Sequence, residues 1–153
     1  MKLSEWAHIS EITSAIAVVV SLIYIGLEVN QNTAAVTANT RQSMIDYGRE
    51  QSEILVTNET LSNLVDKGES NSATLTPREQ SQFYEFTIWR FAMWESSFLN
   101  HEKGLLDDDS WIAWDAYYRF IMIGKPGYAQ FWSDTRATWH PLFMDHIDSI
   151  TMQ

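Results

Sequence analysis

The sequence predicts an all-α protein, in which an N-terminal hydrophobic helix continues into a long helix and then into a compact, aromatic-rich helical bundle. Three observations support this. Residues 12–27 form an uncharged, strongly apolar run, and apolar residues in the later segments recur at helical spacing between cap and turn signals. No β-hairpin signal occurs. We expect three regions: a hydrophobic helix over residues 1–30, a juxtamembrane helix over 31–57, and a helical head domain over 58–153.

The apolar run lies between Glu11 and Glu28 and holds sixteen residues without a charge. A helix of that length spans roughly 24 Å, and extension to Ile9 and Val29 gives about 31 Å, enough to cross a hydrocarbon core. The interpretation as a single transmembrane helix competes with a buried helix in a soluble bundle or oligomer core. A cleaved signal peptide fits less well, because Lys2 is outnumbered by Glu5 and Glu11.

Small residues recur along one side of this predicted helix, at spacings of four, three and four. They are Ser10, Ser14, Ala17 and Ser21. Small side chains on one helix face let two backbones approach closely in lipid, where packing and weak hydrogen bonds drive association. The pattern therefore predicts association between copies of this helix.

After Glu28 the chain becomes polar but contains no proline, so the helix is expected to continue as one rod over residues 3–56. We expect a weakly amphipathic helix here, with a kink near Gly48. Thr57, Asn58 and Thr60 predict a break, followed by a short helix that ends near Gly68. Residues 69–74 are polar and predict a solvent-exposed loop.

A central helix is predicted over residues 77–103. Thr76 and Glu79 form a capping box and Pro77 occupies the first helical position. Aromatic and aliphatic residues surround this helix on nearly every side, so we expect it to be buried. Arg90 and Glu95 are its notable polar residues. They are five residues apart, on different faces, so each is expected to find its partner on another helix.

The remaining segments predict further helices. Gly104 ends the central helix, and residues 107–110 form an acidic cap for a helix that buries Trp111, Trp114, Tyr118 and Ile121. Asp115 and Arg119 form an i,i+4 ion pair in the favourable order. Residues 124–127 form a turn, and two short helices follow, the last one opened by Pro141.

Composition excludes several functions. The net charge is −10, and residues 31–153 carry −8, so the head lacks the clustered cations that nucleic acids or anionic lipid surfaces require. Cysteine is absent, which excludes disulfides and thiolate ligands. We find no phosphate loop, dinucleotide fingerprint, nucleophile elbow, zinc motif or paired di-iron motif. His101 beside Glu102 is interpreted as a helix-end contact, so no metal, cofactor or catalytic residue is predicted.

A set of short motifs is distributed along essentially the whole chain. The motifs are Ser4-Glu5-Trp6-Ala7, Ile9-Ser10-Glu11-Ile12, Ala15 to Val19, Ser21 to Tyr24, Leu75-Thr76-Pro77 with Glu79, Glu95 with Phe98, Gly104 to Asp107 with Trp111, and Pro126-Gly127 with Trp132. Together they resemble a bacterial family of uncharacterised small α-helical proteins with an N-terminal hydrophobic helix. The resemblance implies a single-pass protein of the bacterial inner membrane and implies no reaction. Similar proteins often carry arginines directly after the hydrophobic helix, which favours a cytoplasmic head, whereas here Arg41 is the first downstream base.

Three functions are consistent with these observations. The leading hypothesis is a non-enzymatic, membrane-anchored interaction or accessory protein that self-associates through its N-terminal helix, or that binds a membrane-protein partner. The alternative is a small-ligand binding or sensing domain, with a polar pocket in the aromatic core formed by Arg90, Glu95 and Arg119. There Arg90, Arg119 or Arg136 would pair with Glu95. The third is a soluble helical oligomer with the N-terminal helix as its core.

Overall fold

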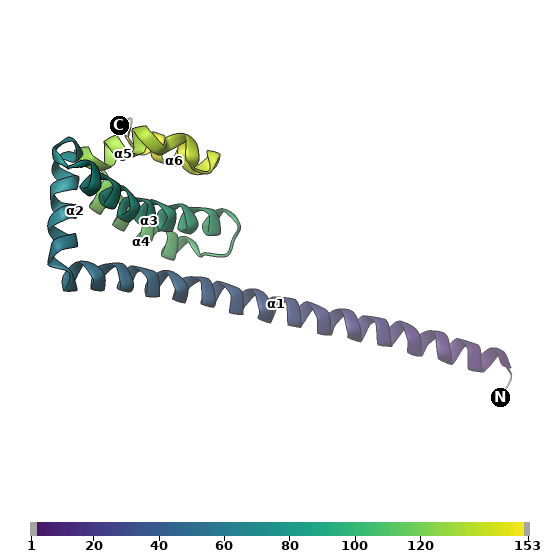
Figure 1. Ribbon diagram of the computed structural model, residues 1–153. Helices are drawn as coiled ribbons and strands as arrows, with labels where there is room; N and C mark the ends of the chain where they lie inside the picture. The colour runs from purple at the N-terminus through teal and green to yellow at the C-terminus, as the bar shows by residue number, and fades with distance from the viewer. Residues whose placement is uncertain (1–2, 152–153) are drawn as a thin grey trace. The chain divides into compact units, whose positions relative to one another are not determined.

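A computed structural model describes the backbone of residues 3–151, and the side chains of that range except those of residues 3–9 and Ile12. Ile9 and the opening motif around Trp6 therefore lie outside the described side chains. The all-α prediction is confirmed, since the described residues form six α-helices and no strand (Figure 1). The helices are α1 (Leu3–Thr57), α2 (Glu59–Asn71), α3 (Pro77–Glu102), α4 (Asp108–Met122), α5 (Pro126–Thr135) and α6 (Pro141–Thr151), with 3-10 turns η1 (Ser72–Thr74) and η2 (Arg136–Thr138).

The chain divides into two compact units, Met1–Ala38 and Asn39–Gln153, and the division falls inside α1. The C-terminal part of α1 thus belongs to the same unit as the head helices. Its residues Met44 and Gln51 are buried, and a Cβ added at Gly48 would lie 3.0 Å from the Trp114 ring of α4. The helix continues through Gly48, so this glycine provides room for Trp114 rather than an interruption.

The predicted end of the short helix near Gly68 is wrong, and so is the predicted loop over residues 69–74, although most of these residues are exposed to solvent as expected. Helix α2 continues to Asn71, and η1 follows directly. Gly68 is buried inside α2 because it lies against Gly127 of α5, where an added Cβ would come 1.8 Å from the Gly68 carbonyl oxygen. A glycine that permits this close approach of two helices gives the same sequence signal as a glycine that ends one.

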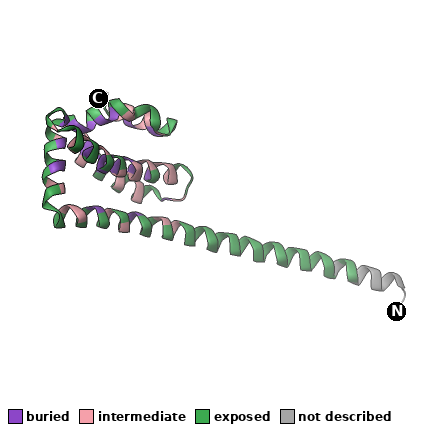
Figure 2. Cartoon of the chain, in the orientation of Figure 1, coloured by how far each residue is buried: buried purple, intermediate pink, exposed green. Residues whose placement is uncertain are grey.

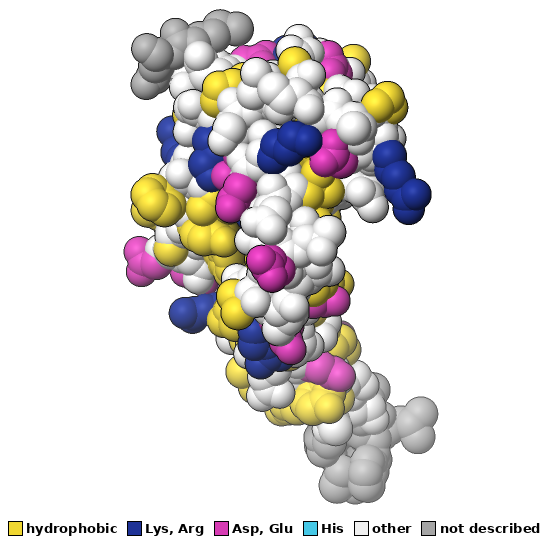
Figure 3. Space-filling view, turned by 60° about the vertical axis from the view of Figure 1, so that its left-hand side comes forward, with side chains coloured by type: hydrophobic (Ala, Val, Ile, Leu, Met, Phe, Trp, Pro, Cys, Tyr) yellow, Lys and Arg dark blue, Asp and Glu magenta, His cyan; other side chains and the backbone are white. Residues whose placement is uncertain are grey.

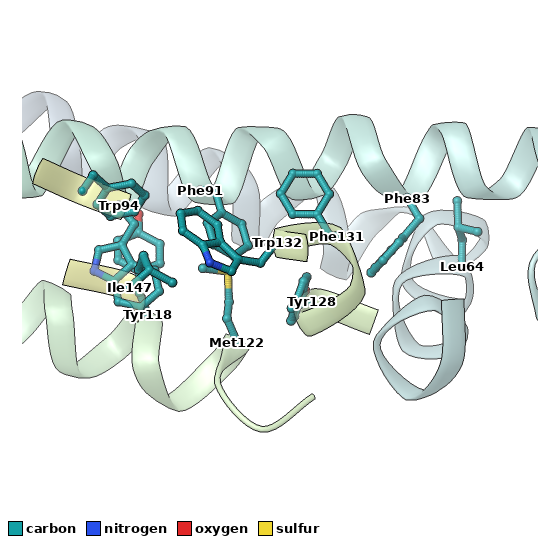
Figure 4. Close-up of a cluster of buried hydrophobic side chains, with 11 residues drawn as sticks. Leu64, Phe83, Phe91, Trp94, Tyr118, Met122, Tyr128, Phe131, Trp132 and Ile147 are labelled. Carbon is teal, nitrogen blue, oxygen red and sulfur yellow. The ribbon is translucent and has the colours of Figure 1, made fainter. Parts of the chain in front are cut away.

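Helix α3 is the centre of the head and contacts α2, α4, α5 and α6. Its predicted start is confirmed: the Thr76 hydroxyl accepts from the Glu79 amide, and the Glu79 carboxylate accepts from the Thr76 amide. Phe83, Phe91 and Trp94 are completely or almost completely buried in the aromatic core (Figure 4). The prediction that α3 is buried on nearly every side is wrong, because Ile88 and Glu85 are exposed on its outer face.

Helices α4, α5 and α6 complete the core. The acidic cap at Asp107 is confirmed, since its carboxylate accepts from the Ser110 amide at 2.9 Å. Tyr118 is buried, and Gly124 has a positive φ of 85° in the predicted turn before α5. Rings from α3, α5 and α6 pack against one another, as in the stacked pair Phe91 and Trp132, whose centroids lie 5.5 Å apart.

Candidate functional site

The most unusual surface of the described chain is the N-terminal part of α1. Ten large apolar side chains there are between 53% and 65% exposed: Ile16, Val18, Val19, Val20, Leu22, Ile23, Tyr24, Ile25, Leu27 and Val29. These positions cover most directions around the helix axis, and the narrow face that remains holds Ser14, Ala17, Ser21 and Glu28. Figure 2 shows this exposure. Within α1, buried residues appear only in the C-terminal part of the helix.

This exposed surface is far from what a soluble monomer presents. Contiguous exposed apolar patches larger than a few hundred Å² mark interaction or membrane surfaces. By length and composition, the described part of the chain contains one helix that could cross a membrane, near the N-terminus. The arrangement can therefore contact lipid or other apolar helices.

The four small residues predicted to mediate helix association are all exposed on this segment. Ser10, Ser14, Ala17 and Ser21 share one face, because α1 is helical throughout. The Ser21 hydroxyl donates to the Ala17 carbonyl at 2.8 Å. This bond satisfies the hydroxyl within its own helix and leaves the face shallow.

Arg90 lies at the centre of a buried polar cluster that joins three helices. Its Nη1 donates to Glu69 Oε1 of α2 at 2.8 Å and to the Tyr128 hydroxyl of α5. Tyr128 in turn donates to Glu69 Oε1 at 2.6 Å, and the Lys125 ammonium donates to Glu69 Oε2. The expectation that Arg90 has its partner on another helix is confirmed, and the partner is Glu69.

The electrostatics of this cluster favour the ionised carboxylate. Burial by itself raises the pKa of Glu69, but hydrogen bonds from Lys125 and Tyr128 and the charges of Lys125 and Arg90 outweigh it and lower the pKa. Burial raises the pKa of Tyr128 far above its usual range, so it stays a donor. The Arg90 guanidinium also lies 4.7 Å from the centre of the Phe86 ring. The cluster is a buried, paired network that fixes α2, α3 and α5 together.

Glu95 has a different environment. Its carboxylate accepts from the backbone amide of His140 at 2.7 Å, directly before α6. The prediction that an arginine pairs with Glu95 is wrong, since Arg90, Arg119 and Arg136 each pair with another carboxylate. Acidic groups are favourable at a helix N-terminus because of its free amides and dipole, so Glu95 acts as a cap for α6.

Arg119 belongs to a third group, centred on Asp115. The predicted Asp115–Arg119 pair is confirmed, with 2.7 Å between Asp115 Oδ2 and Arg119 Nε. Asp115 Oδ1 also accepts from Trp94 Nε1 at 2.9 Å and lies 2.8 Å from His146 Nε2. Burial raises the pKa of Asp115, but the bonds from His146, Trp94 and Arg119 outweigh it and lower the pKa. The structure thus places Arg90, Glu95 and Arg119 in three separate contacts and not around one pocket.

The described residues contain no group of three or more His, Asp or Glu side chains that could hold a metal ion. His101 lies 3.0 Å from Asp108 and stacks on Trp111, with 5.4 Å between the ring centres. Figure 3 shows Lys, Arg, Asp and Glu side chains interspersed on the face in view. That face therefore presents no concentrated region of one charge.

Sequence reasoning missed Glu69 because its neighbours are polar and the segment was predicted to be a loop. A signal was present in the glycines. Gly68 directly precedes Glu69, and Gly127 directly precedes Tyr128. A glycine inside an otherwise helical pattern often marks close backbone packing.

Compared with models of protein families, with curated proteins and with solved structures, the chain matches none of them.

Proposed function

We propose that this protein is a non-enzymatic, membrane-anchored interaction or accessory protein of the bacterial inner membrane. In this proposal residues 9–29 span the bilayer once, and copies of the chain associate through Ser10, Ser14, Ala17 and Ser21. The observation that carries the proposal is the exposure of large apolar side chains over most of the circumference of α1 between Ile16 and Val29. Leaving one such side chain exposed to water costs about 1.5–3 kcal/mol of free energy relative to burying it. The segment therefore requires an apolar environment.

Two properties of the head support the interaction role. Its surface is acidic, and each charged residue considered as a site component is already paired or caps a helix. Its aromatic core holds side chains from α2 to α6 together, as a rigid unit displayed by an anchor would require. In lipid, shallow small-residue faces pair through close backbone packing, which supports a homo-oligomer.

Alkaline carbonate washing of membranes tests the anchor. We expect the unaltered chain to stay with the membrane and the double variant Val18→Lys/Leu22→Lys to be released, because a lysine near the centre of a transmembrane helix costs about 2.5–3.5 kcal/mol. The matched control is Ile112→Lys/Phe120→Lys, which changes two exposed apolar residues of the head and should leave the chain in the membrane. Release of the unaltered chain as a uniform, detergent-free oligomer would instead support a soluble assembly with α1 as its core.

Crosslinking in mild detergent tests self-association. We expect Ser14→Leu and Ser21→Leu to reduce the crosslinked oligomer several-fold, since the larger side chains separate the helix backbones. Val19→Leu, on the opposite side of the helix, is the control and should crosslink like the unaltered chain. Equal crosslinking in all three variants would contradict the small-residue interface and leave the anchor intact. A second protein recovered in the crosslinked complex would identify a membrane-protein partner.

A further inference from the structure

The head contains a cavity of about 480 Å³ that none of the contacts described above explains. Its walls come from the end of α4, from α5 and from α6, and α3 supplies part of the floor. The volume falls in the range of small-molecule sites, roughly 300–1,000 Å³. The cavity is not lined by Arg90, Glu95 or Arg119, so it differs from the polar pocket that the sequence suggested.

The floor of the cavity is apolar and belongs to the protein core. Phe91, Met122, Trp132 and Ile147 line it, and each is at most 7% exposed. Figure 4 shows Phe91, Trp132 and Met122 close together. Such a surface suits an aliphatic chain, because the chain would leave water and contact flat rings and a flexible thioether.

The rim of the cavity is polar and carries two cations, Lys125 and Arg136, against one carboxylate, Asp148. Arg136 donates from Nε and Nη2 to Asp148, which leaves the two hydrogens of Nη1 for another acceptor. The Lys125 ammonium donates to Glu69 and has three hydrogens in all. Both cations are therefore ion-paired, and the hydrogens of Arg136 Nη1 and Lys125 Nζ that these pairs do not use are donors beside an apolar floor, which suits an anionic head group.

We propose that this cavity binds a single-chain amphiphile with a carboxylate or similar anionic head. The aliphatic chain would cover Phe91, Met122 and Trp132, and the head would accept hydrogen bonds from Arg136 and Lys125. An amphiphile with a cationic head would find only hydrogen-bond donors at the same two residues. The site does not depend on the membrane anchor, since every lining residue lies between positions 91 and 151.

Binding can be measured on the full chain in nanodiscs of zwitterionic lipid, with octanoate as the probe. The indole N–H of Trp132, which donates to Asp148 at 3.1 Å, is the reporter in a ¹⁵N-labelled sample, assigned with Trp132→Phe. We expect a saturable shift of this signal with octanoate and none with octyltrimethylammonium. No saturable shift with octanoate, or equal shifts with both probes, would overturn the proposal.

Two variants locate the site. Ala129→Trp places a bulky ring at an exposed position of the cavity wall and should abolish the octanoate shift, whereas Ala113→Trp on α4, also exposed, should preserve it. Arg136→Gln should weaken octanoate binding about tenfold, the loss of one charge-assisted hydrogen bond. Equal binding in Ala129→Trp and Ala113→Trp would place octanoate elsewhere and overturn the assignment.

The source of the anionic amphiphile is tested by changing the lipid. If anionic phospholipid in the nanodisc moves the Trp132 signal before octanoate is added, and octanoate then competes, the site takes a lipid acyl chain with its head group. If only octanoate moves the signal, the site takes a free fatty acid. If neither moves it, the proposal is wrong.

Discussion

The N-terminal segment of α1 and the head are both rich in apolar residues, but these side chains are exposed in the first and buried in the second. Val19 and Leu22 are more than half exposed, whereas Phe83 and Phe131 of the head are fully buried. The difference lies in the pattern rather than the amount of hydrophobicity. In α3 the buried residues follow one helical face, while in residues 13–29 large apolar side chains cover most of the helix circumference. A helix of the second kind needs an apolar environment that the described chain does not supply.

The head and the apolar segment should differ most in their tolerance of substitutions at helical glycines. Gly127→Ala should destabilise the head by about 4 kcal/mol or more, because its new Cβ would lie 1.8 Å from the Gly68 carbonyl oxygen and force α2 and α5 apart. Gly26→Ala, in the apolar segment, has nothing within 4 Å of the new Cβ and should not destabilise. Urea unfolding followed by tryptophan fluorescence measures both. Equal stability of the two variants would contradict the close helix contact.

Charge burial provides the second contrast. Glu69→Ala should lower the free energy of unfolding by about 3 kcal/mol, because it leaves Arg90 buried without its carboxylate. Glu85→Ala removes an exposed carboxylate from α3 of the same head and should change the free energy of unfolding by less than about 0.5 kcal/mol. Thermal unfolding monitored by near-ultraviolet circular dichroism distinguishes them. Similar melting of both variants would mean that the Glu69 cluster is not buried.

Acid should affect the two regions differently. The pKa values of Glu69 and Asp115 are lowered from ordinary values of 4.5 and 3.8, so their contribution to stability is complete above about pH 4.5 and is lost as pH falls through the lowered values. Residues 13–27 contain no carboxylate. We therefore expect the near-ultraviolet signal of the head to disappear in acid while the amide signals of Val18, Val19 and Val20 remain helical. Simultaneous loss of both signals would contradict this separation. Glu69→Gln should reduce the pH dependence.

The smallest expected effect concerns Glu95. Glu95→Ala should cost about 1 kcal/mol, the loss of one capping bond to the His140 amide at the start of α6. The same substitution at Glu69 is the comparison and should cost about three times as much. Urea midpoints of the two variants provide the test. A decrease of 3 kcal/mol or more in the free energy of unfolding of Glu95→Ala would contradict the capping role and support the buried ion pair that the sequence suggested.

Much of the fold followed from local sequence signals. The Thr76–Glu79 capping box, Pro77, the acidic cap at Asp107 and the Asp115–Arg119 pair all form as predicted, because each depends on residues within one or two helical turns. The errors concern contacts between helices. Residues 69–74 look like a loop until Gly68 meets Gly127, and Glu95 looks like an ion-pair partner until α6 begins beside it.

The sequence by itself determined the all-α class, the positions of the helix caps and the apolar character of residues 12–27 in α1. These are properties of short stretches of chain, governed by backbone geometry, capping and periodicity. Only the tertiary structure decided that Glu69 is the partner of Arg90, and that Lys125 and Arg136 lie at the rim of an apolar cavity. The contacts that fix these residues join positions 12 to 59 apart, and helix packing selects them from several carboxylates and cations that the sequence alone leaves equivalent.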